Sequence, residues 1–129
     1  MKLRISSIAD RGNHDKERLV VKVLNDAELG FFAIFRSRTA NGQLTTGVSD
    51  VYWFGEADVK SGDLVVVYTR AGTDNNRIQK SGSTVHFFYW HQREAFWGDE
   101  EFVPVLVLTS DWEPFPEIQH QISRDEALP

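Results

Sequence analysis

The amino-acid sequence predicts an all-β fold in which two sheets pack face to face. Apolar and polar residues alternate with a period of two in short segments along the chain, which is the pattern of half-buried strands. Gly, Asn, Asp and Ser residues separate these segments and supply the chemistry of turns. No stretch shows sustained helical periodicity. We therefore expect an immunoglobulin-like antiparallel β-sandwich of about seven strands, with an extended C-terminal tail, and a small barrel is the alternative.

The strands can be justified in chain order. Residues 2–8 alternate polar and apolar side chains, and residues 18–24 and 31–37 are rich in β-branched and aromatic side chains. The clearest pair follows, because two apolar segments flank a polar connector that ends in the turn-forming residues 61–63. In full, the predicted strands span residues 2–8, 18–24, 31–37, 48–54, 64–70, 84–92 and 102–109, and the separators include residues 11–15, 41–42, 72–82 and 98–99.

Length and charge define the expected organisation. A chain of 129 residues suits one domain, which we expect at residues 1–110, followed by an acidic, proline-containing tail at residues 111–129. The net charge is −5, and five acidic residues against one arginine place most of it in the tail. The nearly neutral body lacks the broad positive field of proteins that bind phosphate backbones.

The sequence suggests a soluble protein of a reducing compartment. It has no cysteine, which removes disulfides and thiol nucleophiles, and it contains no apolar run long enough for a membrane helix. We therefore expect a cytoplasmic localisation.

The sequence gives little support for a catalytic or metal-binding site. His86 and His91 are five residues apart, so a regular strand would place them on opposite faces, where they cannot share an ion. The adjacent acids at 99–101 and 125–126 are expected to be solvated and ionised. We predict no catalytic residues, no metal and no cofactor. A small hydrolase with an unrecognised site remains a third hypothesis, which requires a His in a cleft beside a carboxylate or a Ser.

The order of elements resembles the lamin tail domain, an immunoglobulin-like module. The likeness rests on the strand 17–25 that ends in Asn25, on Tyr52-Trp53-Phe54, on the Gly62 turn that precedes an apolar strand, and on Phe96-Trp97-Gly98-Asp99 before the last strand. The link after Asn25 differs from the family pattern, and the 72–82 loop is long. The resemblance implies a module for recognition or attachment with no catalytic residues to carry over.

One predicted strand is apolar on both faces. Val85, Phe87 and Tyr89 point one way, and His86, Phe88 and Trp90 point the other. One face fills the core, and the second must be covered by a loop, by the tail or by another molecule.

We expect the chain to act as a non-catalytic interaction or assembly module. Interfaces favour aromatic residues and arginine at their energetic centres. Trp97 beside Gly98 is expected to be structural. The candidate partner-binding residues are Trp53, Trp90, Trp112, Phe115 and Ile118, with Arg36 and Arg38 at a rim.

The tail admits two interpretations. Residues 111–118 alternate acids with bulky apolar residues and contain two prolines, so they form an extended peptide that can lie in a groove. Trp112, Phe115 and Ile118 could anchor a partner, or they could fold back and cover the sandwich of their own chain. Exchange of the tail between two copies would satisfy both.

Nucleic-acid binding is the alternative function. Arginine beside an exposed tyrosine can hold a single strand by charge and stacking. The residues that suggest it are Arg36, Arg38, Arg70, Arg77 and Lys80.

Overall fold

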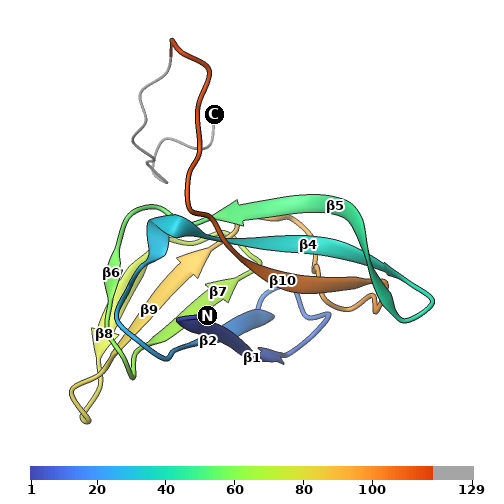
Figure 1. The fold of residues 1–129 in the computed structure, drawn as a ribbon. Helices are drawn as coiled ribbons and strands as arrows, with labels where there is room; N and C mark the ends of the chain where they lie inside the picture. The colour runs from blue at the N-terminus through green and yellow to red at the C-terminus, as the bar shows by residue number, and fades with distance from the viewer. Residues whose placement is uncertain (118–129) are drawn as a thin grey trace.

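A computed structural model describes residues 1–117 as a structure that is nearly all β. One sheet has the strand order β1-β2-β7-β9-β8, and a second has the order β10-β4-β5 (Figure 1). The strands of the first sheet are β1 (Leu3–Ala9), β2 (Arg18–Val23), β7 (Leu64–Tyr68), β9 (Thr84–Tyr89) and β8 (Asn75–Ile78). Those of the second are β10 (Phe102–Leu108), β4 (Phe32–Ala40) and β5 (Gln43–Trp53).

A small third sheet joins the two layers at one end. It pairs β3 (Ala27–Glu28) with β6 (Asp58–Val59), and the 3-10 turn η1 (Leu29–Phe31) leads from it into β4. No helix among residues 1–117 is long and apolar enough to cross a lipid bilayer.

The predicted all-β sandwich is confirmed, and each of the predicted segments contains a strand. The strands β3, β6 and β8 were not predicted. The first two have only two residues each, and β8 is exposed along its length with three polar residues before Ile78, so none of them shows an alternating pattern.

One pairing departs from a purely antiparallel sandwich. Strands β7 and β9 run parallel, with Val66 opposite Phe87 and Tyr68 opposite Tyr89. Residues 69–83 connect them, and this connection is long enough to return the chain to the same end of the sheet before β9 begins. Strand β8 lies within that connection and pairs antiparallel with β9 on its far side.

The core lies between the two large sheets. On β2, Leu19, Val21 and Val23 are buried and alternate with Arg18, Val20 and Lys22, which are more exposed. Side chains from both layers meet there. The five-stranded sheet contributes Leu3, Leu19, Val21, Val65 and Val67, and the three-stranded sheet contributes Phe32, Ile34 and Tyr52, together with Phe54 directly after β5. Full burial of each such side chain contributes about 1.5–3 kcal/mol, so this cluster supplies the main stabilisation of a chain without disulfides.

The two sheets explain how the segment 84–90 can be apolar on both of its faces. Phe88 and Trp90 pack on the core, whereas Val85, Phe87 and Tyr89 lie on the outside of the five-stranded sheet. The connection after β7 covers Tyr89, because a Cβ on Gly72 would lie 2.4 Å from its ring. A loop therefore supplies part of the cover that the sequence required.

Candidate functional site

The outer face of the three-stranded sheet carries uncharged and mostly apolar side chains. Core-facing residues such as Ile34, Tyr52 and Leu106 pair across the strands, so their sequence neighbours point outward. The outward residues form cross-strand rows: Val103, Ser37 and Val48; Val105, Phe35 and Val51; Val107, Ala33 and Trp53. None of them is charged. Val51 is 49% exposed and Val48 is 41% exposed. We call this set of side chains the apolar face.

Three aromatic rings extend the apolar face at one end. The ring of Trp112, from the tail, lies 5.4 Å from that of Trp53 and 5.7 Å from that of Phe31, in edge-on geometry. The indole Nε1 of Trp53 donates a hydrogen bond to the carbonyl oxygen of Gly30, at 3.1 Å, which fixes the ring. The start of the tail is therefore held against the sandwich of its own chain. This agrees, for Trp112, with the interpretation that the tail folds back.

The next tail residues do not share this contact. Phe115 is 69% exposed, and Figure 1 shows the tail rising away from the sandwich after β10. Ile118, the third expected anchor, lies outside the described residues. Trp53, Trp112 and Phe115 thus remain candidates for partner contact.

Trp90 is a correction to the predicted surface anchors. It is only 5% exposed and belongs to the core cluster, where its ring lies 5.5 Å from that of Tyr52 and 5.2 Å from that of Phe96. Its position directly after β9 places it on the inward side. Trp97, expected to be structural, is fully buried, and its Nε1 has no hydrogen-bond partner among the described residues.

Arg36 is also not a free rim residue. Its guanidinium carbon lies 3.7 Å from the centre of the Phe102 ring and 4.5 Å from that of Phe96, and its side chain is 16% exposed. Its Nε donates to the carbonyl oxygen of Phe96 at 3.2 Å. Arg36 therefore closes one end of the sandwich by stacking and hydrogen bonding. Arg38, on the same side of β4, is more exposed and pairs with Glu101 at 3.3 Å.

The five basic residues of the nucleic-acid alternative do not form one surface. Arg36 and Arg38 lie on β4 of the three-stranded sheet, whereas Arg70 follows β7 and Arg77 lies on β8 of the other sheet. Lys80 is exposed in the turn between β8 and β9. The tyrosines near Arg70 are also occupied, because Tyr68 and Tyr89 stack on each other with ring centres 5.3 Å apart and Arg70 lies over both.

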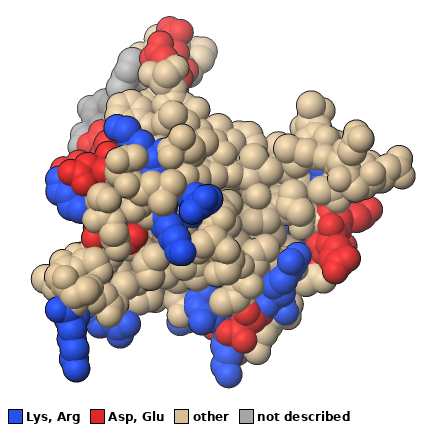
Figure 2. Space-filling model, turned by 60° about the horizontal axis from the view of Figure 1, so that its bottom comes forward, with Lys and Arg blue, Asp and Glu red and all other residues tan. Residues whose placement is uncertain are grey.

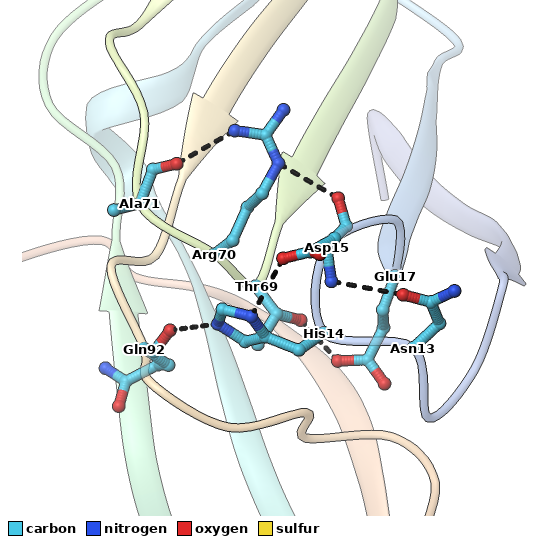
Figure 3. Close-up of polar contacts among 8 residues, drawn as sticks. All are labelled: Asn13, His14, Asp15, Glu17, Thr69, Arg70, Ala71 and Gln92. Carbon is cyan, nitrogen blue, oxygen red and sulfur yellow. Dashed lines mark hydrogen bonds and ion pairs between the residues drawn. The ribbon is translucent and has the colours of Figure 1, made fainter.

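Arg70 belongs to a polar cluster that joins three loops (Figure 3). Its Nε donates to the carbonyl oxygen of Asp15 at 3.0 Å, and His14 Nε2 lies 2.6 Å from the carbonyl oxygen of Gln92. A carbonyl oxygen only accepts, so His14 Nε2 carries a proton and donates it to this bond. The contacts attach the loop after β1 to the ends of β7 and β9.

Glu17 is the residue that sequence reasoning missed. Its carboxylate is fully buried and accepts from the backbone nitrogens of Gly12, Phe96 and Trp97, at 2.8–2.9 Å, and from the Thr69 hydroxyl. One side chain thus holds three separate segments. No sequence signal distinguishes Glu17 from an ordinary acid before a strand, because its partners are as far away as residue 97.

A second buried carboxylate organises the turn before β7. Asp63 accepts from the backbone nitrogens of Lys60 at 3.0 Å and Thr84 at 2.9 Å, and from His86 Nε2 at 2.9 Å. Burial raises the pKa of Asp63, but these hydrogen bonds and the charge of His86 outweigh that effect and hold the pKa below its usual value. His86 faces inward to reach Asp63, while His91 lies beyond the strand with a φ of +60°.

The contacts of the Asp63–His86 pair are those of a structural interaction that holds the turn before β7 against β9. The carboxylate is occupied by two backbone donors and one imidazole, and both side chains are largely buried. No group of three or more His, Asp or Glu side chains within residues 1–117 is arranged to hold a metal ion.

Comparisons with protein-family models, with curated proteins and with solved structures find no match to this chain. The resemblance to the lamin tail domain therefore stays a prediction.

Proposed function

We propose that this chain is a non-catalytic protein-interaction module, similar to a lamin tail domain, whose contact surface is the apolar face. The observation that supports the proposal is the unbroken set of uncharged side chains on the outside of β10, β4 and β5. Soluble proteins rarely leave such a surface in water, and those that do mostly use it to bind a partner.

The chemistry of this face suits protein contact. Val103, Val105 and Val107 give it an aliphatic surface, and the aromatic residues at its end resemble the Trp- and Tyr-rich centres of interfaces. Trp112 lengthens the surface because it packs on Trp53. A partner would bury the face by hydrophobic contact, so its affinity would depend little on salt.

A charge placed in the middle of the apolar face tests the proposal. We expect Val51→Asp to remove association of the full-length chain, with itself or with a cross-linked partner, because binding would then bury an unpaired carboxylate. The affinity should fall at least about tenfold. Because Val51 is 49% exposed, the variant should still fold. The measurements are sedimentation velocity over a concentration series and cross-linking of the full chain.

Ile78→Asp is the matched control. Ile78 is 74% exposed on β8, outside the apolar face, and the substitution introduces the same charge. It should leave contact through the apolar face unchanged. If Val51→Asp and Ile78→Asp behave alike, the apolar face is not the contact surface.

A further inference from the structure

The five-stranded sheet carries charge of one sign only. Its strands contain Arg4, Arg18, Lys22 and Arg77 but no aspartate or glutamate, although the whole chain has a net charge of −5. On β2, Arg18 and Lys22 alternate with the buried residues, so they lie on the outer face. Register places Arg4 and Arg77 on the same side. The outer face of this sheet is therefore basic.

Three of these cations form one cross-strand row. Arg4 lies opposite Lys22, Lys22 opposite Leu64, Leu64 opposite Val85, and Val85 opposite Arg77. We call this set the basic row. Figure 2 brings the bottom of the molecule forward and shows basic side chains at separate places, with uncharged surface and some acidic side chains between them.

The cations of the basic row are available for a ligand. Arg18, at the other end of β2, pairs with Asp10 at 2.7 Å, and Arg70 donates to the carbonyl oxygen of Asp15. In contrast, Arg4, Lys22 and Arg77 form no salt bridge with the described carboxylates. The ligand for the basic row should therefore be anionic, with an apolar part to cover Leu64, which is half-buried, whereas Val85 is already buried.

The tail of the same chain has this composition on its exposed side. Side chains alternate along an extended peptide, and Trp112 is held against Phe31 and Trp53. Consistent with that anchor, Trp112 and Pro114 are half-buried, while Glu113 and Phe115 are exposed; beyond Phe115 the alternation ends, and both Pro116 and Glu117 are exposed. The exposed side thus presents a carboxylate, an aromatic ring and a carboxylate.

The two patterns also agree in length. Lys22 and Arg77 are separated by three strand spacings, which is about 14 Å. The segment from Glu113 to Glu117 spans about 13 Å when fully extended, so the turn at residues 116–117 would have to open on binding. When the carboxylates face the two cations, Phe115 lies between them, over Leu64.

We propose that the tail of one copy, at Glu113, Phe115 and Glu117, binds across the basic row of a second copy. This inference goes beyond the proposed function, because it names a second copy of the chain as a partner and a contact surface other than the apolar face. The tail of a given copy does not lie on the basic row of that same copy. Trp112 holds it on the three-stranded sheet, and it leaves that sheet on the side away from β1 and β2 (Figure 1). Tail and basic row are different surfaces, so the contact is head-to-tail and builds oligomers.

Charge exchange in the full-length chain tests the proposal. The row variant carries Lys22→Glu and Arg77→Glu, and the tail variant carries Glu113→Lys and Glu117→Lys. We expect each variant alone to associate at least about tenfold more weakly, because like charges then face each other. An equimolar mixture should regain the association, since each altered surface then meets its complement. Sedimentation velocity at about 0.05 and 0.5 M salt should show that added salt weakens the contact.

The control reverses two exposed cations outside the basic row, Lys16→Glu and Arg93→Glu, and so changes the net charge equally. It should associate like the original chain. Circular dichroism melting of all variants verifies that they are folded.

The outcomes separate this proposal from the proposed function. If Val51→Asp removes association while the charge variants and salt have no effect, the apolar face is the interface and the tail proposal is overturned. If the charge variants weaken association and Val51→Asp does not, the proposal that the apolar face is the contact surface is overturned instead. A monomeric chain at every concentration, or a basic row that binds an oligothymidine without any self-association, also overturns the tail proposal.

Discussion

At the scale of single residues, two buried carboxylates fix the loops of this protein. Glu17 accepts hydrogen bonds from three segments, and Asp63 joins the turn before β7 to the start of β9. Each carboxylate offers several lone pairs, so one side chain can satisfy backbone donors that would otherwise be buried without partners. These residues hold the sandwich ends in place in a chain that has no disulfide.

Glu17→Gln should destabilise the fold. The amide has a single acceptor oxygen, so at least one of the nitrogens of Gly12, Phe96 and Trp97 loses its partner. We expect a loss of about 2 kcal/mol in the free energy of unfolding, measured by urea denaturation. Glu113→Gln, in the exposed tail, should change it little. A Glu17→Gln variant as stable as the original chain would contradict the role of Glu17.

Asp63 should make stability depend on pH. Its pKa in the folded protein lies below the ordinary value of 3.8, so its carboxylate stabilises the fold above that pH. The contribution is lost as pH falls through the depressed pKa, because the folded state must then accept a proton. Urea denaturation should show Asp63→Asn to be destabilised near neutral pH, with a difference from the original chain that shrinks in acid. A difference that is constant with pH would contradict this assignment.

At the scale of elements, alternation predicts strands well but does not predict how they pair. The segments with β-branched and aromatic residues became β1, β2, β4, β5, β7, β9 and β10. The parallel pairing of β7 with β9 was not predictable, because both directions place the same residues inside. Strand β8 was not predicted because its residues are exposed. It forms by pairing with β9 and not by burying side chains, so it has no alternating pattern in the sequence.

The connection after β7 provides a prediction at this scale. Gly72 lies so close to Tyr89 that a Cβ would meet its ring atoms at 2.4–2.7 Å. We expect Gly72→Ala to displace the connection or the ring and to lower the free energy of unfolding by about 1–3 kcal/mol. Gly47→Ala is the control, since the nearest atom to its Cβ would be the Thr45 hydroxyl oxygen, 3.3 Å away. Equal effects at both positions, measured by thermal unfolding, would contradict the close packing.

At the scale of the whole molecule, the two layers present different chemistry to solvent. The outer face of the three-stranded sheet is uncharged and apolar, whereas the strands of the five-stranded sheet bear only basic charge. The acidic tail begins beside the apolar face, where Trp112 meets Trp53. This separation gives the molecule one surface for hydrophobic contact and one for an anionic ligand, which is why salt distinguishes them experimentally.

The sequence by itself determined the strand segments, the all-β class and the acidic character of the tail, because alternation and composition are local properties of the chain. Tertiary structure alone decided that Trp90 is core, that Arg36 stacks between two rings, and that Glu17 and Asp63 bind distant backbone. It also decided that Arg4, Lys22 and Arg77 share one row. These facts depend on strand order and register, which join residues far apart in the chain and therefore leave no signal in any single segment.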